Sequence, residues 1–316
     1  MNTRRSFLKT GLALGASAAV LPSLAQAVAV EQPSPAANAA AKDATKEKSV
    51  LVAVREGSRA AMLDKAMAEL GGIGRFVKKG QLVVIKPNIG WNATPERGAN
   101  THPELVGAMV KLCRDAGAAR VVVFDKTCDK WTDTYSRSGI EAAVKAAGGE
   151  MAPGNDESWY KDCEFPKGKI LKSGKVHRLV LEADVFINMP VLKHHSGSLV
   201  TASMKNLMGV IWDRGFYHKA SLHQCIADFV TFRAPDLNIL DAYHPMFRHG
   251  PRGKTVEDVV EKRMLFASTD IVAIDAAGAK VLDREPTQVT HIGMAQELGL
   301  GVMDLSKVDI RRHSLA

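Results

Sequence analysis

The chain has 316 residues, of which 46% are hydrophobic and 24% are charged, and its formal net charge is +8 at pH 7. This is an ordinary globular composition, long enough to bury a large core. The basic excess comes with neither a basic helix nor an alternation of aromatic and basic residues, so the composition excludes a typical nucleic-acid-binding protein.

The first 27 residues predict an export signal. The sequence RRSFLK at residues 4–9 is followed by an apolar run over residues 11–20 and by AQA at residues 25–27, a small-residue cleavage site. This order is typical of a twin-arginine (Tat) signal peptide, and the apolar run is shorter than the ~20 residues of a membrane span. We therefore expect a periplasmic protein, exported by the Tat machinery, with no transmembrane segment after cleavage. Cleavage would remove three basic residues and no acid, lowering the charge from +8 to +5.

Residues 28–48 are rich in alanine, proline, serine and lysine and lack periodicity, which predicts a disordered linker. Residues 49–316 predict a single α/β domain, because short apolar runs alternate with amphipathic helical patterns. We expect a mostly parallel sheet flanked by helices, with a small β-excursion in residues 151–181. The predicted strands are 50–54, 82–85, 120–125, 184–188, 237–241 and 263–267, and the predicted helices are 59–70, 103–116, 140–147, 221–232, 271–282 and 289–298.

Polar side chains follow four of the predicted strands at the point where each strand ends. In open α/β sheets, ligands bind at the carboxyl ends of the strands. The competing explanation is that turns and caps begin there, which asparagine and aspartate also favour. For the set as a whole we favour a binding site, formed by Lys86 and Asn88, by Asp125, by Asn188 and Lys193, and by Asp241 and His244.

Residues 188–213 have the highest density of chemically active side chains. Within fourteen positions they contain Lys193, His194, His195, Ser196, Ser198, Thr201, Ser203, Lys205 and Asn206. We expect Ser203 to cap a short helix whose free N–H groups attract an anion. Lys205 in the first turn of that helix opposes the helix dipole, a local conflict typical of functional sites, although a surface lysine would explain it equally.

Other candidates have equally plain alternatives. Lys86 follows a strand and is fixed by Pro87, so it could offer its charge to a carboxylate or phosphate, or simply extend along the strand end into water. The loop HGPRG at residues 249–253 either covers a ligand or is only a turn. Asp270 is expected to cap a helix, and Asp275, within that helix, either reaches the site or faces water.

The histidines and cysteines leave metal binding open. His194, His195 and His244 are the candidate ligands of a divalent metal, but adjacent residues on a strand point to opposite sides, and no ligand motif is present. The four cysteines lie outside any C-x-x-C pair, so an iron–sulfur cluster is not expected. If a disulfide forms in the oxidising periplasm, we favour Cys128 with Cys163, since both lie in loop-like stretches.

Several motifs resemble a bacterial and archaeal family known as domain of unknown function 362. They are VVIKPN from Val83, THPELV from Thr101, VVVFD from Val121, EADVFINMPVLKHH from Glu182, TASMKNLMG from Thr201, HGPRG from His249 and STDIVAIDA from Ser268. Many relatives carry an additional ferredoxin-like domain with clustered cysteines, which we do not expect here. The resemblance implies a shared site made of Lys86, Asn88, His102, Asp125, Lys193, His195, Lys205, Asn206, Asp270 and Asp275.

Three functional hypotheses follow. The first is an exported enzyme, or enzyme-like protein, acting on an anionic small molecule, with metal assistance left open. Lys193 and Lys205 would hold the anion, His195 would be acid/base or ligand, and Asp125 would orient a partner, while ligand binding would also involve Lys86, Asn88, His102, Asn206, His249, Asp270 and Asp275. The second is a non-catalytic periplasmic ligand- or metal-binding protein, and the third is an iron–sulfur redox protein.

Overall fold

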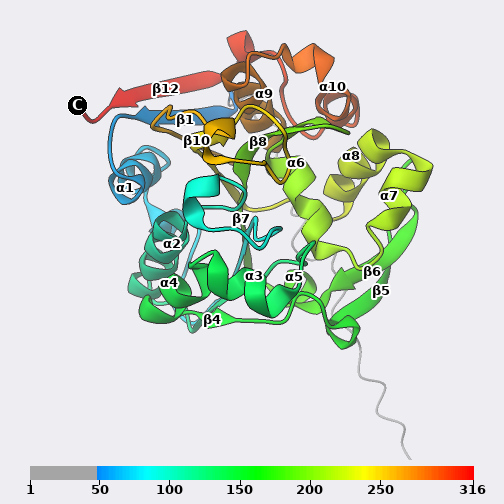
Figure 1. Ribbon diagram of the computed structural model, residues 1–316, viewed down its shortest axis with the longest axis horizontal. Helices are drawn as coiled ribbons and strands as arrows, with labels where there is room; N and C mark the ends of the chain where they lie inside the picture. The colour runs from blue at the N-terminus through cyan, green and yellow to red at the C-terminus, as the bar shows by residue number, and fades with distance from the viewer. Residues whose placement is uncertain (1–47) are drawn as a thin grey trace, which may run out of the picture. The chain divides into compact units, whose positions relative to one another are not determined.

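The computed structural model describes residues 48–316. The predicted signal peptide and nearly all of the predicted linker lie outside the described residues. In the described part, helices pack against both faces of one large sheet (Figure 1). The fold is therefore the α/β fold that the sequence predicts.

The main path of the sheet contains eight strands, and all but one run in the same direction. The exception is β11, which is antiparallel to both of its neighbours. In spatial order the strands are β12 (Asp309–Ser314), β1 (Val50–Arg55), β11 (Met264–Ser268), β10 (Leu237–Met246), β7 (Val185–Met189), β2 (Leu82–Pro87), β3 (Arg120–Val123) and β4 (Glu150–Met151).

Two further strands extend the sheet beside the end of β7. β8 (Val191–His195) pairs with β10, and β9 (Leu199–Thr201) pairs with β8. The predicted β-excursion is present as a separate two-stranded sheet, formed by β5 (Tyr160–Glu164) and β6 (Ser173–His177). Residues 178–181, which we expected to continue as β-structure, instead begin a short helix, α5 (Arg178–Glu182), capped by the His177 side chain.

The two faces of the sheet bury two separate apolar clusters. Alternate residues of one strand serve both clusters, as Val83 and Ile85 of β2 face one and Val84 faces the other. The helices that pack on the Val83 face are α1 (Arg59–Glu69), α2 (Pro103–Asp115), α3 (Trp131–Arg137) and α4 (Ile140–Ala146). On the other face are α5, α6 (Ser203–Asn206), α7 (Gly215–Ala220), α8 (Leu222–Phe232), α9 (Ile271–Val281) and α10 (Thr290–Glu297).

Two remaining findings concern the described residues only. None of their helices combines the length and the apolar character that a membrane crossing requires. All four cysteines are free thiols, so the preferred Cys128–Cys163 disulfide is wrong. Cys163 lies on the separate β5–β6 sheet, whereas Cys128 follows β3 in the main sheet. The loop-like sequence around each cysteine does not indicate where that cysteine lies in the fold.

Candidate functional site

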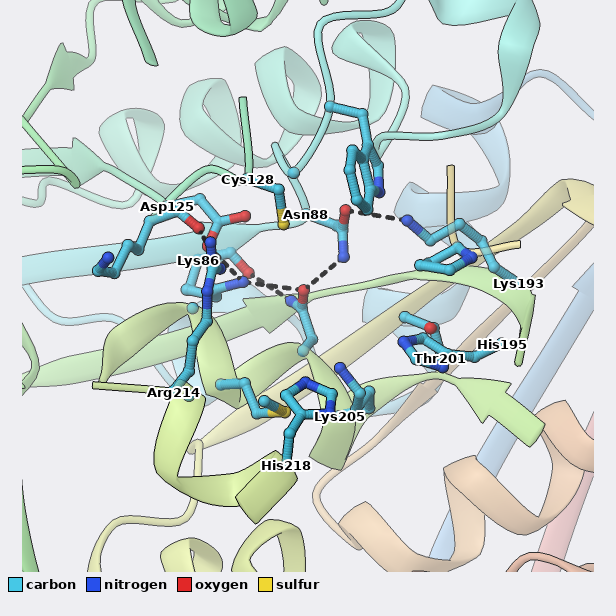
Figure 2. Close-up of a pocket in the computed structure, with 18 residues that line it drawn as sticks. Lys86, Asn88, Asp125, Cys128, Lys193, His195, Thr201, Lys205, Arg214 and His218 are labelled. Carbon is cyan, nitrogen blue, oxygen red and sulfur yellow. Dashed lines mark hydrogen bonds and ion pairs between the residues drawn. The ribbon is translucent and has the colours of Figure 1, made fainter. Parts of the chain in front are cut away.

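A cavity of ≈ 540 Å³ lies where β2 and β3 end and β8 passes (Figure 2). Among the described residues, its side chains include five cations and one carboxylate, Asp125. We call it the cationic cavity. The residues that line it are Lys86, Asn88, Gly90, Trp91, Asp125, Lys126, Cys128, Lys193, His195, Thr201, Lys205, Asn206, Met208, Gly209, Arg214, Gly215, His218 and Pro251.

Lys86 and Asp125 form a buried ion pair in the wall of the cationic cavity. The distance from Lys86 Nζ to Asp125 Oδ1 is 2.8 Å, and the two side chains are 1% and 3% exposed. Burial lowers the pKa of Lys86, and the carboxylate of Asp125 opposes that shift. The second oxygen of Asp125 accepts a hydrogen bond from the Ile89 backbone N–H at 2.7 Å. The pair is thus held in place by the loop that follows β2.

Asparagines connect this ion pair to Lys193, as the dashed lines in Figure 2 show. Asn206 Oδ1 accepts from Lys86 Nζ at 2.9 Å and from Asn88 Nδ2 at 3.0 Å. Asn88 Oδ1 in turn accepts from Lys193 Nζ at 3.2 Å. Asn188 lies beneath the network and accepts from Asn206 Nδ2 at 2.8 Å. Each amide group is oriented by several partners, so the wall of the cavity is rigid.

Gly209 allows this wall to close. It lies in the 3₁₀ turn Leu207–Val210, and a Cβ atom there would come within 1.9 Å of Asp125 Oδ1 and 2.7 Å of Lys86 Nζ. No side chain larger than hydrogen fits at that distance. The backbone of Gly209 also holds the loop after β3, since its carbonyl accepts from the Lys126 N–H at 3.0 Å.

Lys193 is a buried amine with two fixed acceptors. Its Nζ donates to the Ala99 carbonyl at 2.6 Å and to Asn88 Oδ1, and its side chain is 1% exposed. Burial lowers the pKa of Lys193 to about 7, and the nearby Lys205 amine acts in the same direction. The amine is therefore close to half-protonated at neutral pH, a state suited to accepting or releasing a proton.

Lys205 projects into the cationic cavity from α6 (Figure 2). Within residues 48–316 its amine has no hydrogen bond and no ion pair, unlike those of Lys86 and Lys193. Burial lowers the pKa of Lys205 to about 8, and Arg214 and Lys86 contribute to that shift. The predicted position of Lys205 in the first turn of a helix is correct.

The start of α6 differs from the sequence prediction in its cap. Ser203 does not cap the helix, because its hydroxyl has no hydrogen-bond partner in the described part of the chain. The Asp275 carboxylate does so instead, accepting from the Ser203 N–H at 2.6 Å and from the Met204 N–H at 3.0 Å. The helix N-terminus is thus occupied by a protein carboxylate and is not available to an external anion. Asp275 supports α6 and does not line the cavity.

His195 lines the cavity as a neutral imidazole. Its Nδ1 accepts from the backbone N–H groups of Gly197 and Ser198, at 2.9 and 3.2 Å. Burial lowers the pKa of His195 to about 3, with Lys205 and Lys193 adding to the shift. A neutral ring that accepts at Nδ1 has its hydrogen on Nε2. His195 is therefore arranged as a hydrogen-bond donor rather than as a base.

Several lining residues were not among the sequence candidates. The guanidinium of Arg214 donates to the Lys126 carbonyl at 2.7 Å and to the Thr127 carbonyl at 2.5 Å, which holds it against the loop after β3. Lys126 Nζ lies 4.2 Å from the centre of the Trp212 ring. Arg214 follows the 188–213 segment by one position, and Lys126 and Cys128 follow a predicted strand end, so proximity to those signals could have indicated them. His218 had no such signal.

The fourth strand end does not reach this cavity. Asp241 and His244 of β10 form a separate cluster with Arg59, at 3.4 Å from Arg59 Nε to Asp241 Oδ1 and 3.3 Å from Arg59 to His244 Nδ1. His102 caps α2 and donates its backbone N–H to Asp241, so it belongs to this cluster as well. β10 pairs with β8 at Asp241 and again at Met246, and the pairing is irregular in the interval between them, which contains His244.

Asp270 and His249 also lie outside the cavity lining. Asp270 caps α9, as predicted, by accepting from the N–H groups of Val272 and Ala273. His249 bonds to Asp258 at 2.6 Å, and its side chain is 48% exposed. Only Pro251 of the HGPRG loop lines the cavity. Gly250 brings that loop against β8, since a Cβ atom there would lie 1.8 Å from the His194 carbonyl.

The candidate metal ligands are not brought together. In the part of the chain that the structure describes, no three histidine, cysteine, aspartate or glutamate side chains form a group able to hold a metal ion. His244 belongs to the Arg59 cluster, and His194 neighbours His195 on strand β8, where successive side chains point to opposite faces. The Nδ1 atom of His195 is already bonded to two N–H donors. This set of donors does not fit a divalent metal.

Comparisons with known proteins place the chain among its relatives. It is 27% identical to the thylakoid-associated protein sll1697 of Synechocystis sp. over 260 residues, which cover 77% of this chain and 76% of that protein. Among solved structures, the lactate racemase apoprotein of Thermoanaerobacterium thermosaccharolyticum matches with a TM-score of 0.47 and 11% identity over 72% of this chain. A protein of Thermotoga maritima matches with a TM-score of 0.43 and 10% identity over 75%.

The chain spans 56% of the length of the first of these structures and 59% of the second. The model of the family described as domain of unknown function (DUF362) matches residues 83–280, which contain every side chain that lines the cationic cavity. The chain belongs to the DUF362 family.

Proposed function

We propose that the chain is an enzyme that binds an anionic small molecule in the cationic cavity and moves a proton on it. The observation that carries this proposal is the imbalance of charge: in the part of the chain that the structure describes, the cavity is lined by Lys86, Lys126, Lys193, Lys205 and Arg214, with Asp125 as the single acid. Asp125 compensates Lys86 by direct contact. The remaining cations meet no carboxylate from residues 48–316 within the cavity, and an anionic ligand would supply the missing negative charge.

Different cations suit different tasks. Arg214 is held by two backbone carbonyls, so its other N–H groups are oriented for a carboxylate or phosphate. Lys193 has a pKa of about 7 and is fixed by two acceptors, which suits a general acid or base. The neutral His195 would donate a hydrogen bond to the ligand, and Asp125 would keep Lys86 charged and in position.

Titration calorimetry with oxalate and with inorganic phosphate tests the binding part of this proposal. We expect binding by the wild-type protein and at least a ~10-fold loss of affinity in Arg214→Ala, since a charge-assisted hydrogen bond to a partly buried anion contributes about 1.5–3 kcal/mol. Arg137→Ala is the matched control, because Arg137 is exposed on α3. Equal affinity of the Arg214→Ala and Arg137→Ala proteins would contradict the assignment of the cavity.

Deuterium exchange tests the catalytic part. An anion with an acidic C–H bond is incubated with the protein in D₂O and followed by NMR, and we expect exchange that is lost in Lys193→Met. If the anion binds but is recovered without exchange or any other change, the protein is a binding protein, which was the second sequence-based hypothesis. The iron–sulfur hypothesis has no support from the described residues, since Cys113 and Cys225 are buried on opposite faces of the sheet.

We also propose that the chain is exported through the twin-arginine route. The support is the RRSFLK sequence at residues 4–9 and the cleavage site at residues 25–27. Replacement of Arg4 and Arg5 by lysine is expected to retain the protein in the cytoplasm. Cell fractionation of the wild-type and doubly substituted proteins measures this, and a periplasmic location of the substituted protein would contradict the proposal.

A further inference from the structure

The four lysines of the cationic cavity are not chemically equivalent. Lys86 is bound by Asp125 and Asn206, and Lys193 donates to Ala99 and Asn88. Lys126 lies over the Trp212 ring. Within the described residues Lys205 alone among them has an amine with no hydrogen bond, ion pair or aromatic contact. An amine that donates to fixed acceptors must break those hydrogen bonds before it can react. The amine of Lys205 has no such bonds to break.

The base of the Lys205 side chain is rigid although its amine is free. On one side, the Asp275 carboxylate holds the start of α6 through the N–H groups of Ser203 and Met204. On the other side, the next residue, Asn206, is fixed by Lys86, Asn88 and Asn188. The half-buried side chain therefore enters the cavity from a backbone segment that hydrogen bonds hold on both sides. Such a position is suited to a nucleophile that must meet a bound substrate in one orientation.

The neighbours of Lys205 favour its uncharged form. Figure 2 shows its amine between His218 and the pair formed by His195 and Thr201, with Arg214 across the cavity. No carboxylate pairs with it in the described part of the chain, and Arg214 and Lys86 disfavour a further positive charge. An amine that is buried beside other cations loses its proton more readily and becomes nucleophilic, and the pKa of about 8, lowered chiefly by burial, agrees with this. An anion anchor would not require this loss of charge.

We propose that Lys205 forms an imine with an aldehyde or ketone that carries a carboxylate or phosphate group. The lone pair of the amine adds to the carbonyl carbon, and the carbonyl oxygen takes up a proton. The nitrogen gives up one of its two protons, and the resulting hydroxyl group accepts a second proton and leaves as water while the nitrogen forms a double bond to carbon. This gives an iminium ion, which becomes the neutral imine when the nitrogen loses its second proton. No oxidant or reductant is needed. The anionic group of the substrate would lie against Arg214, and Lys193 is the nearby group with a pKa suited to the proton transfers.

This inference rests on the proposed function, because it names the substrate class and the covalent step of the same cavity. The iminium ion withdraws electrons from the neighbouring carbon, which would assist the removal of a proton there. The proposed imine also gives separate tasks to two lysines that the sequence analysis treated alike, as anion ligands. Lys205 would be the nucleophile, and Lys193 the acid or base.

Reductive trapping tests the proposal. The protein is incubated with pyruvate, glyoxylate or dihydroxyacetone phosphate, sodium cyanoborohydride is added, and peptide mass spectrometry locates any reduced adduct. We expect stoichiometric adduct on Lys205 with at least one of these compounds and at least a ~10-fold lower total yield in Lys205→Arg. Lys219→Ala, which removes an exposed lysine from the adjacent α7, is the control and should give the wild-type yield.

Lys205→Arg separates the two proposals, since arginine keeps the positive charge but cannot form an imine. Oxalate binding by the wild-type protein, together with loss of trapping in Lys205→Arg, supports both. Oxalate binding without an adduct from any of the three carbonyl compounds overturns the imine and leaves the proposed function standing. The same holds if adducts are spread over surface lysines and are equally abundant in Lys205→Arg. Absence of oxalate and phosphate binding in the wild-type protein would overturn the proposed function itself.

Discussion

At the scale of single residues, the buried Lys86–Asp125 ion pair keeps one positive and one negative charge together in the wall of the cavity. The two side chains are almost fully buried at 2.8 Å, so neither charge is stabilised by water. We expect Asp125→Asn to lower the free energy of unfolding by about 3 kcal/mol at pH 7, because it leaves the Lys86 ammonium group without a counter-charge. Urea unfolding measures this. The loss should shrink as the pH rises, because burial lowers the pKa of the Lys86 amine and the ammonium form is lost.

Asp133→Asn is the control for that measurement, since Asp133 is exposed and bonds to its near neighbours Lys130 and Thr132. It should change the free energy of unfolding by less than about 1 kcal/mol. A loss of equal size in the two variants would show that the Lys86–Asp125 pair has no particular role in the wall of the cavity.

Gly209 provides a second prediction at this scale. We expect Gly209→Ala to lower oxalate affinity by at least ~10-fold, because the new Cβ atom would displace both Asp125 and Lys86 from the positions they now hold. Gly293→Ala in α10 is the matched control, since nothing lies within 4 Å of its added Cβ atom. That control should retain wild-type affinity and gain up to about 1 kcal/mol of stability from helix propensity. Calorimetry and thermal unfolding of both variants measure the two effects.

The residues of the cavity could be predicted only in part. Lys86, Asn88, Asp125, Lys193, His195, Lys205 and Asn206 all line it, because strand ends and an unusual density of polar residues are visible in the sequence. Arg214 and Gly209 could not be predicted in the same way. Their importance depends on which carbonyl or side chain they meet in space, and each is by itself a common surface arginine or turn glycine. Asp241 also follows a predicted strand, as the cavity residues Lys86 and Asp125 do, but it pairs with Arg59 outside the cavity.

At the scale of elements, α6 depends on a cap that comes from another helix. Asp275→Ala is expected to lower the free energy of unfolding by about 2–4 kcal/mol, since the buried N–H groups of Ser203 and Met204 would lose their acceptors. It should also weaken oxalate binding, because Lys205 is attached to the same helix. Denaturant unfolding together with calorimetry tests this, and a stable variant with wild-type affinity would contradict the role of Asp275.

The contribution of Asp275 to the free energy of unfolding is expected to decrease as the pH rises. Burial raises the pKa of Asp275 to about 7, so the native state keeps the proton over a range in which the unfolded chain has already lost it. The contribution of Asp275 to stability is therefore largest below about pH 4 and declines as the pH rises to about 7. The difference between wild type and Asp275→Ala should be larger at pH 5 than at pH 8.

Most helices and buried strands could be predicted, because their apolar periodicity is a local property. The elements that were missed or altered depend on partners distant in sequence. β12 has a single apolar residue, Ile310, so its sequence does not predict a strand, and it forms by pairing with β1. The antiparallel direction of β11 follows from its position between β1 and β10, which no local pattern encodes. Residues 178–181 are β-like in composition but begin a helix behind the His177 cap.

For the molecule as a whole, anion binding should depend on pH in the direction set by the lysines. Lys193 and Lys205, with pKa values of about 7 and 8, are both charged at pH 6 and largely neutral at pH 9.5. The dissociation constant of oxalate, which keeps its charge over this range, should rise by roughly 10-fold or more across it. Calorimetry at a series of pH values measures this. A flat profile would contradict the assignment of these lysines to the ligand.

The excess of cations in the cavity has a practical consequence for any search for the ligand. Any small anion in the medium competes with the ligand for a pocket of this charge. By mass action, an ion that binds weakly but is present at millimolar concentration can exclude a ligand that binds more tightly at micromolar concentration. Phosphate or sulfate in a purification buffer would therefore conceal the physiological ligand and also protect the protein against heat. The same competition would operate in the cell. The natural ligand must therefore bind more tightly than inorganic phosphate through a feature that phosphate lacks, such as a carbonyl group within reach of Lys205.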